Sequence, residues 1–190
     1  MFLINLNFLY SQSKNDEIII LEEVIITDKI KANKKFTYKT KGKDKASLSV
    51  TDNTIFLSRI EIDEKITLKS VNFFFNNREK VFLSNTVFEL IILNENNLDK
   101  PSNPFRNKNL KFEVKPSNNE EIQLNLSMLN LIIEKPFFIG LKKISAEGKL
   151  DFSINLNRKK GESIYLKNKL GDWQIIEDSN IKLEIGYEKD

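Results

Sequence analysis

The stretch Ile181-Lys-Leu-Glu-Ile-Gly-Tyr187 places a large apolar residue at every second position. Successive side chains of a β-strand point to opposite faces, so this alternation predicts a strand with one buried and one solvated face. The same period recurs at Leu110–Val114, Ile122–Leu126 and Leu150–Leu156. Stretches of this kind along the chain predict a structure built from sheets.

Other stretches are apolar on both faces and predict strands that are central in a sheet or covered on both sides. They are Val87–Leu93, Leu129–Ile133 and Phe137–Leu141. Elsewhere the apolar phase slips by one residue, from Ile66 and Leu68 to Val71 and Phe73. A slip of this kind inside a strand predicts a β-bulge near Ser70.

Short clusters of Asn, Pro, Gly and Ser separate these stretches and indicate turns. They lie at Asn76-Asn77, 100–104, 117–119, Lys160-Gly161 and Gly171-Asp172. No window shows a helical period over three turns. About ten strands at this spacing predict an all-β fold, an antiparallel two-sheet β-sandwich that is jelly-roll-like, with minimal helix. A membrane barrel is less favoured, because one Trp and four Tyr are few for its aromatic girdles.

The start of the chain is apolar as far as Tyr10 and then reaches the small residue Ser11. A short apolar segment before a small residue is typical of a signal peptide, and the alternative is a first β-strand. We therefore assign residues 1–11 to a signal peptide, 12–45 to an N-terminal strand and Lys-rich segment, and 46–190 to the β-sandwich domain. The apolar run is too short to span a bilayer, so no transmembrane span is expected.

The net charge of +3 is unevenly distributed. Between Asp28 and Lys45 there are 8 Lys and 2 Asp, a local charge of +6, which leaves −3 for the rest of the chain. A basic body for nucleic acid is therefore absent, and we expect no nucleic-acid partner. The Lys-rich segment fits either an anionic partner or a solvated linker or edge strand.

The chain contains neither Cys nor His. This excludes disulfides, thiolate nucleophiles, Cys-ligated zinc and His-based acid–base catalysis. Carboxylates remain as candidates for glycoside hydrolysis, although their places beside strand ends also fit solvated charges. These candidates are Glu22/Glu23, Glu61/Asp63/Glu64 and Glu120/Glu121. We expect no enzyme activity, no catalytic residue and no cofactor.

A second oxygen-rich group has two interpretations. It consists of Asn94, Glu95, Asn96 and Asp99. Carboxylate and amide oxygens are the ligands that Ca²⁺ prefers, but Asn and Asp are also the residues that turns require. Both interpretations stay open at the level of sequence, and no metal site is assigned.

Four stretches carry a family resemblance. Leu21-Glu-Glu-Val-Ile-Ile-Thr27 resembles the segment that follows carboxypeptidase-regulatory-like domains in cell-envelope proteins of Bacteroidetes. Phe88–Pro101, Pro136–Leu141 and Tyr165–Trp173 resemble successive landmarks of the β-sandwich region of such proteins. The resemblance covers roughly residues 17–187. It implies an exported, jelly-roll-like sandwich with no established catalytic residues.

These observations lead to an expected function. We expect a non-enzymatic binding or structural module of the bacterial cell envelope, located in the periplasm, at the outer membrane or outside the cell. Its partner would be an envelope protein or a glycan. The alternative is a carbohydrate-binding module, because sandwiches that bind sugars use exposed aromatic side chains. The candidate ligand-binding residues are Trp173, Tyr165 and Phe105.

Overall fold

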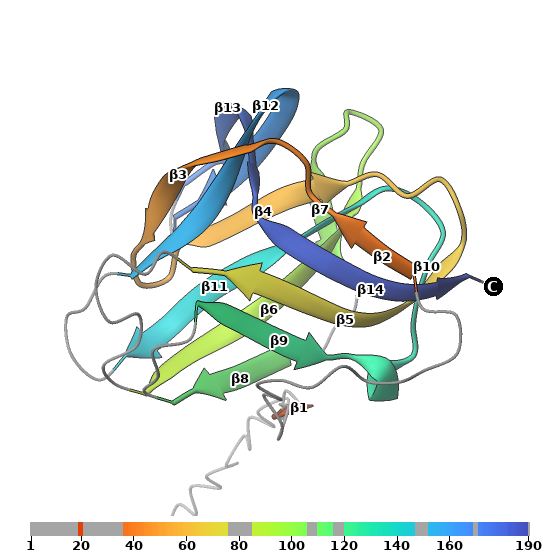
Figure 1. Cartoon of the computed structure of the whole chain (residues 1–190), viewed down its shortest axis with the longest axis horizontal. Coiled ribbons are helices and arrows are strands. Elements are labelled where there is room, and N and C mark those ends of the chain that lie inside the picture. Colours follow the sequence, from red (N-terminus) through yellow and green to blue (C-terminus); the bar gives the residue numbers. More distant parts are fainter. Residues whose placement is uncertain are drawn as a thin grey trace, which may run out of the picture.

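The computed structural model describes residues 19–20, 36–75, 85–105, 110–115, 120–146, 152–168 and 171–189. These residues form fourteen strands and one 3₁₀ turn, η1 (Ser127–Leu129). The strands make two sheets that face each other, so the predicted all-β sandwich is confirmed (Figure 1). No α-helix occurs among the described residues. These residues therefore contain no helix that is long and apolar enough to cross a membrane.

The first sheet contains nine strands and lies behind the second in Figure 1. Along the sheet its main path runs through β1 (Ile19–Ile20), β8 (Leu110–Val114), β6 (Thr86–Glu95), β11 (Phe137–Ala146), β4 (Ile55–Ile60), β12 (Phe152–Lys167) and β13 (Gln174–Ile181). Two further strands join it at the sides, β3 (Lys43–Val50) on β12 and β7 (Pro101–Pro104) on β6. Among these pairs only β1 with β8 is parallel.

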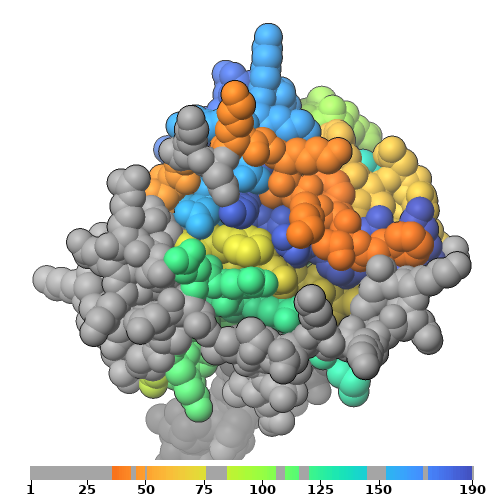
Figure 2. Space-filling model, viewed as in Figure 1, coloured from red at the N-terminus to blue at the C-terminus, as the bar shows by residue number. Residues whose placement is uncertain are grey.

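The second sheet has five strands and faces the viewer in Figures 1 and 2. Its path is β10 (Leu131–Ile133), β5 (Ile66–Phe74), β14 (Leu183–Lys189) and β2 (Phe36–Lys39), and β9 (Glu121–Asn125) also pairs with β5. In Figure 2 the yellow residues of β5 and green residues of β9 form one part of this face, with orange residues of β2 and β3 above them.

Aromatic side chains fill the space between the sheets. The largest fully buried ones in this main core are Phe56, Phe73, Phe75, Phe88, Phe112 and Phe137. Phe88 and Phe112 stack across β6 and β8, with ring centroids 5.5 Å apart. Burial of a Phe side chain contributes about 1.5–3 kcal/mol, so this shared core accounts for the close pairing of the two sheets.

The predicted β-bulge is confirmed. Across β5 and β14, Ser70 pairs with Gly186 and Leu68 pairs with Tyr187, which leaves Lys69 without an opposite residue. The extra residue shifts the phase, so Leu68 and Val71 both face the core. Because of the bulge, the apolar residues before it (Ile66 and Leu68) and those after it (Val71 and Phe73) all face the same core.

Several sequence predictions need correction. Ile181–Tyr187 is not one strand: Ile181 ends β13 in the first sheet and Leu183 begins β14 in the second. Leu129–Ile133 is neither central nor covered on both sides. It forms the end of η1 and then the edge strand β10, on which Ile132 is 39% exposed. The reason is local, because Asn130 adopts the left-handed conformation and interrupts the extended backbone.

Two predicted turns are parts of strands. Pro101–Pro104 forms β7 on β6, since proline is tolerated at a sheet edge. Lys160-Gly161 lies inside β12, where Gly161 has φ 83° within an irregular stretch. Other predictions fall outside the described residues, namely the signal peptide, Glu22/Glu23, Asn76-Asn77 and the turn at 117–119. Strands β2 and β3 begin within the Lys-rich segment, and both pair with strands of the sandwich.

Candidate functional site

Two of the three candidate aromatic residues lie together on the outer face of the first sheet. On β4 the alternation turns Phe56 toward the main core and Leu57 toward the opposite face. There Leu57, Leu93 and Phe138 form a small buried cluster, against which Tyr165 and Trp173 pack. The Tyr165 ring meets Phe138 edge-on, with centroids 5.0 Å apart. Packing therefore holds Tyr165 in one orientation.

Trp173 precedes β13 and is half-buried on the same outer cluster. The ammonium nitrogen of Lys167 lies 5.5 Å from the centroid of its ring. Phe105 lies elsewhere: it follows β7, donates its backbone N–H to Ile92 O at 2.9 Å and packs against the main core. The structure thus brings Tyr165 and Trp173 together and leaves Phe105 apart from them.

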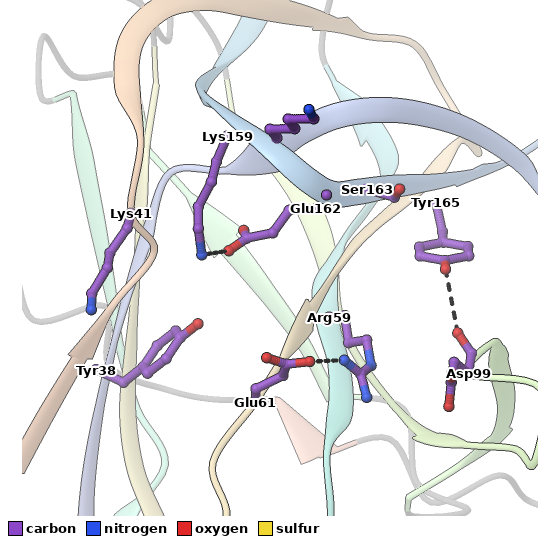
Figure 3. Close-up of a pocket in the computed structure, with 11 residues that line it drawn as sticks. Tyr38, Lys41, Arg59, Glu61, Asp99, Lys159, Glu162, Ser163 and Tyr165 are labelled. Carbon is purple, nitrogen blue, oxygen red and sulfur yellow. Dashed lines mark hydrogen bonds and ion pairs between the residues drawn. The ribbon is translucent and has the colours of Figure 1, made fainter.

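A cleft of about 520 Å³ opens beside Tyr165 (Figure 3). It exists because β12 pairs with β4 only from Ile164 onward. In the preceding stretch the register between β12 and β13 shifts between Arg158 and Ser163, and Gly161 supplies the positive φ that this irregular stretch requires. The separation of β12 from β4 leaves space that side chains of β2, β4, β12 and the β6–β7 turn surround.

Arg59 of β4 forms one wall of the cleft. Its guanidinium group donates to both carboxylate oxygens of Glu95, with Nη2 to Oε2 at 3.1 Å, and also donates to Glu61. The hydrogen bonds to Glu95 are the largest cause that raises the pKa of Arg59 above its usual value, and the hydrogen bond to Glu61 adds to this shift. Because a guanidinium bound at both edges has little rotational freedom, Arg59 presents a fixed positive charge.

On the opposite wall, Glu162 of β12 accepts hydrogen bonds from Lys159 and from the amide of Asn180. Asn180 is 1% exposed, and its amide nitrogen also donates to Lys41 O at 2.9 Å. Asn157, which is 4% exposed, donates to Asn180 Oδ1 at 3.0 Å. This buried amide pair ties β12 and β13 to the segment after β2, and so places Lys41 at the cleft.

Tyrosines occupy two places in the lining. Burial first, then the negative charges of Glu162 and Glu61, raise the pKa of Tyr38 to about 12. Burial also raises the pKa of Tyr165, although the positive charge of Arg59 opposes this shift. The Tyr165 hydroxyl donates to Asp99 O at 3.3 Å. Both hydroxyls therefore stay protonated at neutral pH and are hydrogen-bonding groups for a ligand.

The carboxylates that the sequence offered as candidates for glycoside hydrolysis lie in different places in the structure. Glu61 lines the cleft, whereas Glu64 pairs with Lys189 at 2.7 Å and Glu121 accepts from Asn72 at 2.7 Å. The oxygen-rich turn is organised by its own backbone: Asn96 Oδ1 accepts from the N–H groups of Leu98 and Lys100. No group of three or more carboxylates capable of holding a metal occurs in the part of the chain described.

Sequence reasoning missed most of the cleft. Tyr38 belongs to the Lys-rich segment, and Arg59 looks like the solvated residue of a strand. The one available signal was the run Arg158-Lys-Lys-Gly-Glu162, which places four charges and a glycine within a strand. Comparison of the chain with protein-family models, curated proteins and solved structures found no match.

Proposed function

We propose that this protein is a non-catalytic binding β-sandwich of the bacterial cell envelope and that a saccharide binds in the cleft. The observation that carries the proposal is the lining itself. It consists of two tyrosines, one serine, one glycine and seven charged residues around about 520 Å³. Its volume lies within the range of about 300–1,000 Å³ that is usual for small-ligand sites.

The chemistry of this lining favours a sugar over an apolar ligand. No aliphatic side chain lines the cleft in the described chain. Saccharides present hydroxyl groups that need both donors and acceptors, and charged groups form the stronger hydrogen bonds. Arg59, Glu61 and Glu162 are held in place by their own partners, so less side-chain freedom is lost when a ligand binds.

A binding role also agrees with the pairing of the carboxylates. Glycoside hydrolysis needs one carboxyl group that is kept neutral, usually by apolar surroundings. In the cleft, Arg59 donates to Glu61, and Lys159 and Asn180 donate to Glu162. Glu61 and Glu162 thus each have a cationic partner, which suits a site that binds and does not protonate a leaving group.

Location in the envelope rests on two features of the sequence, namely the apolar segment before Ser11 and the resemblance to cell-envelope proteins of Bacteroidetes. Export predicts that the native protein begins near Gln12. Mass spectrometry of the N-terminal peptide from cells tests this, and a native protein that retains Met1 contradicts export.

Titration calorimetry with a panel of oligosaccharides tests the cleft. Tyr38→Phe and Glu61→Gln remove single polar groups from its lining, so we expect weaker binding with unchanged thermal stability. Trp173→Phe is the matched control, because Trp173 lies on the outer cluster and does not line the cleft. Loss of binding in Trp173→Phe alone would instead identify the outer aromatic surface as the site, and hydrolysis of any panel member would contradict the non-catalytic role.

A further inference from the structure

The charges of the cleft are separated along its length. Near the Lys41 end lie Lys41, Lys159 and Lys160 with one carboxylate, Glu162, which makes a local charge of +2. Glu162 is already bound to Lys159 and Asn180. The ammonium groups of Lys41 and Lys160 are exposed and have no ion-pair partner among the described residues. This end therefore offers two cations to a ligand.

The Tyr165 end has the opposite sign. Among the lining residues at this end, Arg59 is the one cation, and Glu61 and Asp99 supply two carboxylates, a local charge of −1. Arg59 is shared between Glu61 and Glu95. The carboxylate of Asp99 has no hydrogen-bond partner in the described part of the chain. Its backbone N–H donates to Asn96 O at 3.1 Å, and its backbone oxygen accepts from the Tyr165 hydroxyl. Asp99 is thus the free anion of this end.

The strand geometry sets the distance between the ends. Glu162 and Tyr165 are three residues apart on β12, which corresponds to about 10 Å along a strand. Figure 3 shows Lys41 and Lys159 on one side of the cleft and Tyr165 with Asp99 on the other. Opposite charges at this separation produce a field along the cleft, and a ligand with a matching dipole is oriented by it.

We propose that the cleft selects a dipolar saccharide, which places an anionic group against Lys41 and Lys160 and a protonated amino group against Asp99. This inference rests on the proposed binding of saccharides and adds the charge and orientation of the ligand. Neutral sugars complement neither end, and purely acidic sugars meet the carboxylates of the Tyr165 end. The charges of the cleft therefore select the ligand in two ways: they attract both of its charged groups in one orientation, and they repel the same ligand when it is reversed.

A matched set of ligands tests the proposal with the full chain. The probe is a trisaccharide with a uronic acid at one end, a neutral hexose, and an amino sugar with a free amine at the other end. Its counterparts are the methyl ester, which lacks the anion, the N-acetyl form, which lacks the cation, and the doubly blocked form. At pH 6 and low salt, we expect each single block to weaken binding about fivefold, as one partly exposed charge pair would.

Variants assign each ligand group to its end of the cleft. The double variant Lys41→Gln/Lys160→Gln should weaken binding of the trisaccharide and leave binding of its methyl ester unchanged. Asp99→Asn should weaken binding of the trisaccharide and leave binding of the N-acetyl form unchanged. Asn tolerates the positive φ of 54° at this position, so the change removes charge without altering the backbone. Lys135→Gln and Glu113→Gln, both exposed and outside the cleft, are the controls.

The possible results distinguish dipolar selection from saccharide binding itself. If all four ligands bind equally and Tyr38→Phe weakens each of them, the cleft binds saccharides but the dipolar selection is wrong. If the acid is required and the amine is not, the inference is overturned in favour of an anionic sugar. If none of the four ligands binds, the proposed function and the dipolar selection both fail.

Discussion

Gly140 of β11 lies so close to the backbone of Phe56 in β4 that a Cβ atom on it would overlap the carbonyl oxygen of Phe56. The same Cβ would lie 2.9 Å from the Cα of Leu57, which is opposite Gly140 in the register. Backbone atoms in the centre of a sheet cannot move aside as the end of a side chain can. The approach of β11 to β4 therefore depends on glycine at this position.

Gly140→Ala should lower the free energy of unfolding by about 2–3 kcal/mol, because overpacking inside a sheet forces the backbone to shift. Urea denaturation followed by circular dichroism measures the change. Gly171→Ala is the control, since a Cβ on Gly171 meets nothing within 4 Å. Equal stability of the two variants would contradict the steric argument.

Gly186→Ala tests the bulge between β5 and β14. A Cβ on Gly186 would collide with Ser70 Oγ but would lie 3.7 Å from Ser70 Cβ, an ordinary contact. We expect Gly186→Ala to cost about 1 kcal/mol, and to cost less when Ser70→Ala removes the hydroxyl. A double-mutant cycle from urea denaturation gives the coupling energy. Additive costs would show that the two residues do not interact.

Arg59→Met should destabilise the fold by about 2 kcal/mol, because it leaves the carboxylate of Glu95 largely buried without its cation. Glu95 is 12% exposed in its pair with Arg59. The double variant Arg59→Met/Glu95→Leu should be more stable than the single one, since no buried unpaired carboxylate remains. Lys39→Met is the control, because its ion pair with Glu184 is more exposed: the Lys39 side chain is 63% exposed and that of Glu184 is 27% exposed. A similar loss in the control would rule out burial as the cause.

Stability at high pH should depend on Tyr38. Its pKa is raised from 10.0 to about 12 in the folded protein, so between these values the unfolded chain loses a proton that the native chain keeps. Stability from this group is therefore complete below pH 10 and decreases as the pH rises toward 12. Urea denaturation between pH 9 and pH 11.5 should show a shallower decrease for Tyr38→Phe. An unchanged slope would contradict the assigned pKa.

Strands that have one face in the core could be predicted from the sequence. Leu110, Phe112 and Val114 of β8 are all buried, as their spacing requires. The bulge near Ser70 could be predicted as well, because a phase slip within an apolar stretch has few other causes. Local patterning was enough here, since burial on a strand is read directly from alternate positions.

The change of sheet at Lys182 could not be predicted. Ile181 and Leu183 are both buried in the core between the sheets, although they belong to different sheets. Residues on the inner faces of both sheets keep the same alternation, so a strand that passes from one sheet to the other shows no break in period. The 3₁₀ turn before Leu131 was missed for a related reason, because its residues are as apolar as those of a strand.

The period of two in the sequence predicted a protein built from sheets, and the strand spacing with the few Trp and Tyr favoured a sandwich. The lack of Cys and His determined which chemistries are excluded. Only the tertiary structure decided where the cleft lies. Tyr38, Arg59 and Glu162 are far apart in the sequence, and each resembles an ordinary solvated strand residue. They meet because the irregular stretch of β12 separates that strand from β4, and such a separation depends on pairing between distant strands rather than on local pattern.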